Sequence, residues 1–386
     1  MDILISGAGV AGSSLAGWLR RYGVDVTVVE KATGLRDGGY KVDVRGVAVE
    51  VLRRAGVLDL VRAVETQVKD AHFVDSRGKR VATMSADVFG GREGEDLEVL
   101  RGDLVRVLRD AADVEYLFGE WVEEVEDVAG GVRVRFGSGA ERVFDAVVGA
   151  DGLHSRVRGL VFGDESRFRH DLGHHVSIFT SSSDHGLDRE ELLYAEPGRT
   201  TNVYRTAGDG GARALFLFRD DAANGRHGAE RLAEVFAGAG WKVPELVAEA
   251  ARARDLYFDS VSLIRMDRWS RGRVVLVGDA AYAASPASGQ GTSLALVGAY
   301  VLAGELVDGL EGAFERYESL MRDFVTANQA LAETNLKGMV LSSKAKIWFQ
   351  TRMLRLIPHL PGRDRMVERI TEPIRRAATA ITLPDY

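Results

Sequence analysis

The sequence predicts an α/β fold in which a domain with a parallel sheet is interleaved with a mostly β domain and followed by helices. The first observation is a succession of strand, glycine loop, helix and strand over residues 1–30. The second is a series of alternating strands, rich in aromatic residues, in the middle of the chain. The third is helical spacing of apolar residues after residue 312. With 386 residues, the chain has length for two to three domains.

The first 30 residues have the order of a βαβ unit. Residues 3–5 form a short apolar strand, residues 13–22 a helix, and residues 24–29 a second strand. Between the first strand and the helix stands Gly-Ala-Gly-Val-Ala-Gly at residues 7–12, which fits G-x-G-x-x-G. Because strand, loop, helix and second strand follow in the right order, the sequence predicts that this unit binds a dinucleotide.

Each glycine of this motif has a physical reason. Gly7 permits the tight turn, Gly9 lets the backbone approach a pyrophosphate, and Gly12 lets the helix pack closely on the strand. Glu30, eighteen residues after Gly12, is placed to accept hydrogen bonds from ribose hydroxyls. The acidic residue alone does not distinguish FAD from NAD.

A second organised stretch lies late in the chain, at residues 274–302. A buried-strand run at 274–277 leads to Asp279, then to a loop with Pro286, and then to a helix that starts at about Thr292. The N-terminus of such a helix attracts negative charge, whereas Asp279 suits the hydroxyls of a sugar or ribityl chain. The alternative reading is structural: a buried strand, a tight turn and a core helix.

Taken together, these motifs resemble the FAD-dependent (class A) monooxygenases of the para-hydroxybenzoate hydroxylase type, and most of all their tetracycline-modifying members. Two further motifs of that family are present. One is Gly149-Ala150-Asp151-Gly152 with Ser155, Val157 and Arg158, and the other is Arg101-Gly102-Asp103-Leu104 with Leu108. The resemblance spans residues 7 to 303 and implies a GR2-type flavoprotein with a Rossmann-like FAD-binding domain.

The resemblance also implies the chemistry and the residues that hold the cofactor. In that family NAD(P)H reduces FAD, O2 adds to the reduced flavin, and the C4a-hydroperoxide transfers an oxygen atom to the substrate. The chemistry is carried by the flavin, so no protein side chain is predicted to be catalytic. The cofactor-binding residues predicted in this way are Gly7, Gly9, Val10, Ala11, Gly12, Glu30, Lys31, Arg36, Arg45, Arg101, Leu104, Asp151, Asp279, Pro286, Gly289, Gln290, Gly291, Thr292 and Ser293.

Three positions depart from the family's pattern. Tyr282 stands where members often carry His, Ser293 where they often carry Asn, and Gly298 where they carry a later Asp. Asp279 itself is retained, so FAD is still expected. The departures concern the contacts of the flavin ring.

The predicted domains are interleaved along the chain. Residues 1–70, 96–164 and 269–311 are expected to form the FAD-binding domain, and residues 71–95 and 165–268 the substrate-binding domain. Residues 312–386 are expected to be helical and to bridge the two domains. Residues 142–148 read as one strand that returns the chain to the first domain.

The substrate is expected between the two domains, next to the flavin ring. The residues predicted to line this site are Tyr204, Phe216, Phe218 and Pro286. Phe216 and Phe218 share one face of their strand, and Leu215 and Leu217 share the other. The periodicity does not say which face points inward, and a place of both phenylalanines in the core of the second domain remains the alternative.

Composition excludes several other classes. The formal charge of −7 argues against a nucleic-acid partner, and the absence of cysteine excludes disulfides and thiolate metal sites. No metal signature appears. The chain begins directly with a strand, which leaves no room for a signal peptide, and its longest apolar run, at 294–306, is too short to span a membrane. A cytoplasmic protein is expected, as a monomer or a homodimer.

The predicted function is hydroxylation of a mostly apolar, cyclic or polyketide-like natural product or antibiotic, with FAD as cofactor, NAD(P)H as reductant and O2 as co-substrate. Two alternatives remain open at the level of sequence. One is a flavoprotein of the same fold whose FAD is structural and which catalyses a non-redox cyclisation in natural-product biosynthesis. The other is an NAD-linked dehydrogenase or reductase, because a fold alone does not determine a function.

Overall fold

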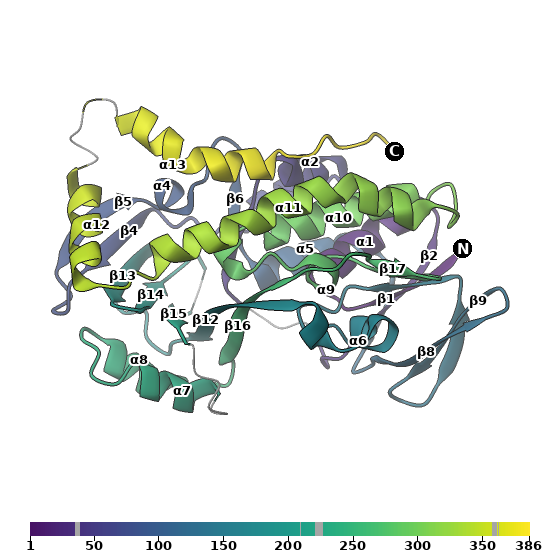
Figure 1. The fold of residues 1–386 in the computed structure, drawn as a ribbon, viewed down its shortest axis with the longest axis horizontal. Coiled ribbons are helices and arrows are strands. Elements are labelled where there is room, and N and C mark those ends of the chain that lie inside the picture. Colours follow the sequence, from purple (N-terminus) through teal and green to yellow (C-terminus); the bar gives the residue numbers. More distant parts are fainter. Residues whose placement is uncertain (35–38, 209, 221–226, 357–360, 362) are drawn as a thin grey trace.

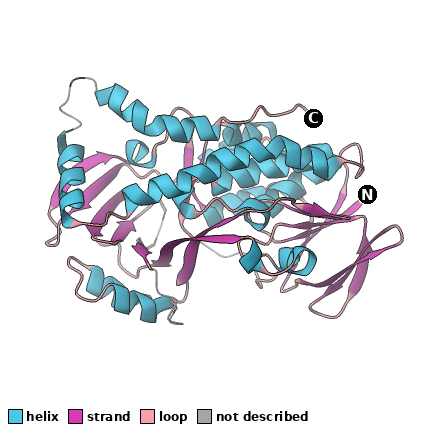
Figure 2. Cartoon of the chain, viewed as in Figure 1, coloured by secondary structure: helices cyan, strands magenta, loops and turns pink. Residues whose placement is uncertain are grey.

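The structure is a computed structural model that describes residues 1–34, 39–208, 210–220, 227–356, 361 and 363–386. Its strands gather in two groups, one at each end of the long axis, and the longest helix lies along both (Figure 2). The α/β fold class predicted from the sequence, with an added mostly β part and C-terminal helices, is confirmed.

The first group is built on a six-stranded sheet in the order β17-β18-β11-β1-β2-β7. All neighbouring pairs are parallel except β17–β18. Its central strands β1 and β11 are buried on both faces, as expected for strands in the middle of a parallel sheet that is covered on both sides. The bounds are β1 (Asp2–Ser6), β2 (Asp25–Glu30), β7 (Glu115–Phe118), β11 (Ala146–Gly149), β17 (Ser270–Arg271) and β18 (Val274–Leu276).

The N-terminal motif and the late motif are brought together by the packing of the helices that follow them, α1 (Val10–Arg21) and α10 (Gly291–Glu305). The helix α1 packs along both α5 (Arg101–Ala112) and α10. The helix α10 is buried from Ser293 to Gly304, because it lies between α1, α2 (Val47–Arg54) and α11 (Ala313–Met339). Other helices of this part are α3 (Leu58–Arg62), α6 (Arg156–Phe162), η1 (Glu165–Arg167), α9 (Asp279–Tyr282) and η2 (Pro286–Ser288).

The predicted single strand at 142–148 is two strands. The first part, β10 (Glu141–Phe144), pairs with β9 (Gly131–Phe136), which pairs with β8 (Val122–Val128) in a separate antiparallel sheet. The second part, β11, enters the parallel sheet. The break falls at Asp145, whose carboxylate accepts the backbone N–H of Asp2 at 2.8 Å and whose own N–H donates to the Asp2 carbonyl at 2.9 Å. Apolar residues stand on both sides of Asp145, so the sequence reads as one continuous strand and does not reveal the change of sheet.

The second group is a seven-stranded sheet in the order β16-β12-β15-β14-β13-β4-β5. The strand β13 was not predicted from the sequence, nor was β6, which pairs with β3 in a small ribbon. The bounds are β3 (Lys41–Val44), β4 (Asp70–Val74), β5 (Arg80–Ser85), β6 (Leu97–Leu100), β12 (Arg169–Thr180), β13 (Glu190–Glu196), β14 (Arg199–Tyr204), β15 (Arg213–Arg219) and β16 (Tyr257–Ile264).

The two faces of β15 meet different surroundings. Phe216 and Phe218 are fully buried on the face that α7 (Gly228–Val235) and α8 (Val243–Ala250) cover, below the sheet in Figure 1. Leu215 and Leu217 are half-buried on the opposite face. The expectation that both phenylalanines line the substrate cavity is therefore wrong. Their alternation was recognised, but the choice of face depends on helices whose docking the strand pattern does not contain.

The C-terminal helices are α11 (Ala313–Met339), α12 (Lys344–Leu356) and α13 (Arg363–Ala378), with α4 (Ala86–Gly90) beside β5. In Figure 1, α11 runs from the side of α10 toward the seven-stranded sheet. Its middle is fastened by Gln329, whose amide donates to the carbonyls of Ile264 and Ala283 at 2.8 and 3.1 Å. Its end is fastened by the hydroxyl of Thr200, which donates to the Met339 carbonyl at 2.8 Å. The helix thus contacts both groups of strands.

Candidate functional site

The glycine loop after β1 contains two glycines that the packing of the fold requires, Gly7 and Gly12, and one that it does not require, Gly9. A Cβ on Gly7, whose φ is +110°, would lie 2.4 Å from the Ala150 carbonyl oxygen. A Cβ on Gly12 would lie 1.9 Å from the Gly7 carbonyl oxygen. A Cβ on Gly9 would meet only the end of the Arg101 side chain, at 3.3 Å. Gly9 therefore borders open space beside a guanidinium group, as a site for a pyrophosphate requires.

The N-terminus of α1 offers free hydrogen-bond donors to the same space. Gly9 caps the helix without a side-chain hydrogen bond, and its first turn has no acidic residue. Glu30 accepts the backbone N–H groups of Ala8 at 3.0 Å and Ala32 at 2.9 Å, so its carboxylate is held at the end of β2 beside the loop. Each oxygen retains a lone pair for a ribose hydroxyl.

The late motif is brought directly against the first one. A Cβ on Gly278, with φ +65°, would lie 2.9 Å from the Cβ of Ala11. The next residue, Asp279, is solvent-exposed, yet surrounding protein raises the pKa of its carboxyl by desolvation, an effect that Arg101 opposes. A side chain that is both accessible and surrounded by protein lies in a cleft. The structure thus places Asp279 and Arg101, 178 residues apart in sequence, close enough to interact.

The start of α10 forms another wall of this cleft. The position of a Cβ on Gly291 lies 3.8 Å from the Asp279 Oδ1 atom. Gln290 is fully buried, and among the described residues neither its side-chain oxygen nor its side-chain nitrogen has a hydrogen-bond partner. Leaving a buried amide unpaired costs about 1–3 kcal/mol for each group. An orphaned amide at an uncapped helix N-terminus fits a ligand with both hydrogen-bond donors and acceptors, such as the edge of a flavin ring.

The other predicted cofactor residues differ in what they expose. Lys31, Arg101, Asp279 and Pro286 are exposed, whereas Gly9, Glu30, Asp151, Gly289, Gly291 and Thr292 are half-buried. Gly7, Val10, Ala11, Gly12, Arg45, Leu104, Gln290 and Ser293 are buried. The side chain of Leu104 is fully buried in the hydrophobic core. It therefore does not face the cleft in which the cofactor is expected. Arg36 lies outside the described residues.

Two predicted side chains are bound within their own loops. The carboxylate of Asp151 accepts the Ser155 hydroxyl at 2.5 Å and the Val157 N–H at 3.0 Å, which leaves it as the anchor of the loop after β11. In the same motif Arg158 is fully buried and donates to the carbonyl of Ala280 at 3.0 Å. Through this hydrogen bond the motif supports the segment that carries Asp279.

The departures from the family pattern at Tyr282 and Gly298 compensate each other. Tyr282 is buried, its pKa is raised to about 12 by that burial, and its hydroxyl lies 2.9 Å from that of Tyr317. A Cβ on Gly298 would lie 2.0 Å from the Tyr282 hydroxyl oxygen. The ring of Tyr282 thus fits because Gly298, its neighbour on α10, has no side chain. Ser293, the third departure, accepts the backbone N–H of Arg45 at 3.1 Å.

Gly298→Ala is expected to lower the free energy of unfolding by about 1–3 kcal/mol, because it overpacks a buried contact. The helix propensity of alanine alone would have the opposite effect. Tyr282→Phe in the same chain should recover part of the loss, since the clashing oxygen is removed. Chemical denaturation of the two single variants and the double variant measures the coupling. Strictly additive changes would contradict this pairing.

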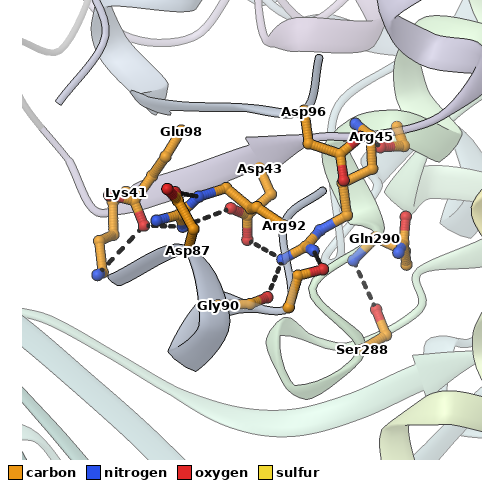
Figure 3. A network of polar contacts seen from close by, with 12 residues as sticks. Lys41, Asp43, Arg45, Asp87, Gly90, Arg92, Asp96, Glu98, Ser288 and Gln290 are labelled. Atoms are coloured by element: carbon orange, nitrogen blue, oxygen red, sulfur yellow. Dashed lines mark hydrogen bonds and ion pairs between the residues drawn. The ribbon is translucent and has the colours of Figure 1, made fainter. Parts of the chain in front are cut away.

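A buried network of charges joins the β3–β6 ribbon to the seven-stranded sheet, and Figure 3 draws its part around Lys41, Arg92 and Glu98. Lys41 on β3 contacts Glu191 on β13 at 2.8 Å and Glu98 on β6 at 3.2 Å, and Arg92 contacts Glu98 at 2.6 Å and Asp43 at 3.2 Å. Burial opposes the charge of Lys41, but both glutamates outweigh it and raise its pKa. The sequence did not point to Lys41, Glu98 and Glu191 as site residues, although charges that alternate with apolar residues in strand-like segments were a signal.

Arg45 and Tyr204 belong to this joint. The Arg45 guanidinium donates to the carbonyls of Gly90 and Gly91 and to the carboxylate of Asp43. The position of a Cβ on Gly289 lies 3.9 Å from the Nη2 atom of Arg45. The Tyr204 hydroxyl accepts the backbone N–H of Lys41 at 3.1 Å. Tyr204 is fully buried, so the expectation that it lines an open cavity is corrected: the approach of β3 to the sheet covers it.

An apolar wall lies between the seven-stranded sheet and η2, next to the cleft. Its buried members are Val176, Val261, Ala287 and Leu336, and its half-buried members are Leu172, Leu215, Leu217 and Tyr257. Asn335 on α11 holds η2 in place by donating to the Ala287 carbonyl at 2.9 Å. The exposed Pro286 precedes Ala287 at the start of η2.

Within the described ranges, no three His, Cys, Asp or Glu side chains gather as they would around a metal ion. Among the helices that the structure describes, none combines the length and the apolar character needed to cross a membrane.

Comparison with known proteins identifies the family. A model of the FAD-binding domain matches residues 1–337. The chain is 37% identical to a flavin-dependent monooxygenase of Legionella longbeachae, with 100% of this chain and 98% of that protein aligned. It is 35% identical to the FAD-dependent monooxygenase asL4 of Sarocladium schorii, over 79% of this chain and 75% of that one.

The solved structure of the tetracycline destructase Tet(51) is similar over 100% of this chain and 99% of that chain, with a TM-score of 0.87 and 32% identity. The glycine loop, the Asp279 cleft and the start of α10 therefore occur in a chain that matches the FAD-binding domain over most of its length. This protein belongs to the FAD-binding-domain family of flavin-dependent monooxygenases.

Proposed function

We propose that this protein is an NAD(P)H-dependent hydroxylase of a mostly apolar, cyclic or polyketide-like compound. The observation that carries the proposal is the position of the apolar wall: Ala287 belongs to it, and four residues later α10 begins with the Gln290–Gly291 end of the cleft. A ring held on this wall would lie beside a flavin held in the cleft. Bound FAD supplies the redox chemistry, and the protein supplies the position of the substrate.

In this proposal each part of the cleft holds a part of FAD. Gly9, Arg101 and the N-terminus of α1 take the pyrophosphate, and Glu30 takes a ribose. Asp279 accepts hydroxyls of the ribityl chain. Gln290 and the first turn of α10 hydrogen-bond to the flavin ring, whose negative charge in the reduced state the helix N-terminus stabilises.

Asp279→Ala is expected to weaken FAD binding by about ten- to a hundredfold, because a hydrogen bond to a charged group contributes about 1.5–3 kcal/mol. Asp279→Asn retains an acceptor oxygen and should lose less. Flavin titration of the ligand-free proteins measures both affinities. If the alanine variant bound FAD as tightly as the parent, Asp279 would have no role in holding the cofactor.

The wall and the relatives support this class of substrate. Aliphatic side chains dominate the wall, which favours an apolar ring system. One similar structure is a tetracycline destructase, and asL4 is an FAD-dependent monooxygenase. Tetracycline and simpler polycyclic phenols are therefore the first compounds to test.

The deciding experiment measures oxygen uptake and NADH or NADPH oxidation by the FAD-loaded protein, with and without each compound. Stimulated consumption together with a product 16 mass units heavier is the expected result. Consumption that yields only hydrogen peroxide means that the compound is not the substrate. A protein that retains FAD but never oxidises either nucleotide with any compound would contradict the proposal and favour a structural FAD with non-redox cyclisation.

A further inference from the structure

A chain of hydrogen bonds runs from the protein surface to the edge of the cleft. His154, in the loop after β11, has a side chain that is 53% exposed. Its Nε2 atom lies 3.0 Å from Oδ2 of Asp259 on β16. The same Oδ2 atom accepts the hydroxyl hydrogen of Tyr257 at 2.9 Å. Tyr257 and Asp259 lie outside the FAD motifs described above, and His154 is a position of the Gly149-to-Arg158 stretch to which that motif assigns no residue.

The charges around this chain determine where its hydrogens lie. A hydrogen bond to Asp259 raises the pKa of His154 to about 9, and a second hydrogen bond to Glu165 acts in the same direction. The Glu165 carboxylate lies 2.9 Å from the Nδ1 atom of His154. At neutral pH both ring nitrogens therefore donate to carboxylates. Glu165 is paired in turn with Arg158 and Arg169. Burial, which raises the pKa of Asp259, is outweighed by His154, so Asp259 stays ionised and acts only as an acceptor.

The single hydroxyl hydrogen of Tyr257 is therefore used in the hydrogen bond to Asp259. Burial and the adjacent Asp259 raise the pKa of its phenol, which keeps the hydroxyl protonated. Its hydrogen goes to Asp259, and its oxygen presents only lone pairs to any further partner. A ligand that reaches this oxygen must therefore bring a hydrogen-bond donor.

The position of Tyr257 makes it accessible to a ligand. On one side its ring packs with the apolar wall. On the other side its ring centroid is 6.4 Å from that of Tyr40, and the charge of Asp279 contributes to its raised pKa. The residue thus stands between the wall proposed for the substrate and the cleft proposed for FAD, and it is only half-buried.

Resting on the proposed function, we propose that Tyr257 accepts a hydrogen bond from a hydroxyl of the substrate, and that Asp259 and His154 are positioning residues that hold its phenol in this orientation. The site then selects rings that carry a phenol or enol hydroxyl over the corresponding methyl ethers. A ring without a donor would leave the Tyr257 oxygen unpaired on binding, which a buried polar group resists.

The test compares 1-naphthol with 1-methoxynaphthalene, the same ring with and without a donor, as probes of the FAD-loaded protein at pH 7. Binding is followed by the change in flavin absorbance. The parent should prefer the naphthol by about three- to tenfold, the effect of one hydrogen bond. Tyr257→Phe should bind both compounds equally with unchanged FAD content. Tyr194→Phe is the matched control, because its hydroxyl donates to Glu196 on the other side of the sheet, and it should keep the preference.

Asp259→Ala separates positioning from a structural role. It frees the Tyr257 hydrogen, so the phenol can donate to an ether oxygen, and the preference should shift toward the methyl ether. His154→Gln should shift it in the same direction by less. Equal weakening of both compounds in Asp259→Ala would mean that Asp259 only supports the fold and would overturn its assignment.

The outcomes also separate this inference from the proposed function. Retention of the full preference by Tyr257→Phe, or no preference in the parent, overturns the inference while nucleotide oxidation stays intact. A clear preference without any nucleotide oxidation overturns the hydroxylase proposal alone. If neither compound binds the loaded parent, the inference is overturned, whereas the hydroxylase proposal is decided by the oxygen-uptake experiment.

Discussion

Gly9→Val is expected to abolish FAD binding while the ligand-free protein keeps its fold. In the structure a Cβ at this position meets only the end of the Arg101 side chain, at 3.3 Å, and that flexible end can move. The branched side chain would then fill the space that a pyrophosphate needs between the loop and Arg101. Flavin titration should show an affinity lowered by at least two orders of magnitude, about 3 kcal/mol or more, with an unchanged melting temperature of the ligand-free protein.

Gly12→Val serves as the contrasting variant. Its Cβ would lie 1.9 Å from a backbone oxygen that cannot move without breaking the turn, so this variant should lose the fold itself. If Gly9→Val bound FAD normally, the pyrophosphate would lie elsewhere. If it melted as low as Gly12→Val, the loop would serve packing alone.

Phe216→Ala is expected to lower the free energy of unfolding by about 3–5 kcal/mol, as for other fully buried phenylalanines. Its ring centroid is 5.0 Å from that of Phe236 and 6.4 Å from that of Phe179, in a cluster that α7 and α8 close. Removal of the ring leaves a cavity in this cluster. Flavin content measured well below the lowered melting temperature should be unchanged.

Leu217→Ala, one residue along the same strand, is the matched comparison. Its side chain is half-buried on the apolar wall, so the loss of stability should be only about 1 kcal/mol. Binding of an apolar ring should weaken instead. The opposite result, with binding lost in Phe216→Ala and stability lost in Leu217→Ala, would place the substrate on the α7–α8 side of the sheet.

The local motifs were predictable because each depends on neighbours in sequence. The turn at Gly7, the packing of Gly12, the acid at the end of β2 and the glycine-rich start of α10 are requirements of short segments. Strand periodicity also located β15, which carries Phe216 and Phe218 on one face. The sheet corner at Asp145 was not predicted, because apolar residues continue on both sides of it while the hydrogen-bonding partners change.

Other errors arose where a residue's partner is remote in sequence. Tyr204 reads as an aromatic lining of a cavity, but Lys41, 163 positions earlier, covers it. Leu104 belongs to a motif of the family, yet its side chain packs into the core. The pattern around Tyr282 was noted as a departure, and only the distance to Gly298 shows how one departure makes room for the other.

The fold class, the family and the glycine and acidic positions of the cofactor motifs could be read from the sequence, because they depend on short-range geometry that a motif records. The folded structure was needed to show which face of β15 the helices α7 and α8 cover, that Asp279 lies close enough to Arg101 to interact, and that Tyr257, Asp259 and His154 form a chain to the surface. Those features depend on contacts between β16, the loop after β11 and the helices around them. Packing in three dimensions brings these segments together, and no periodicity along the chain encodes it.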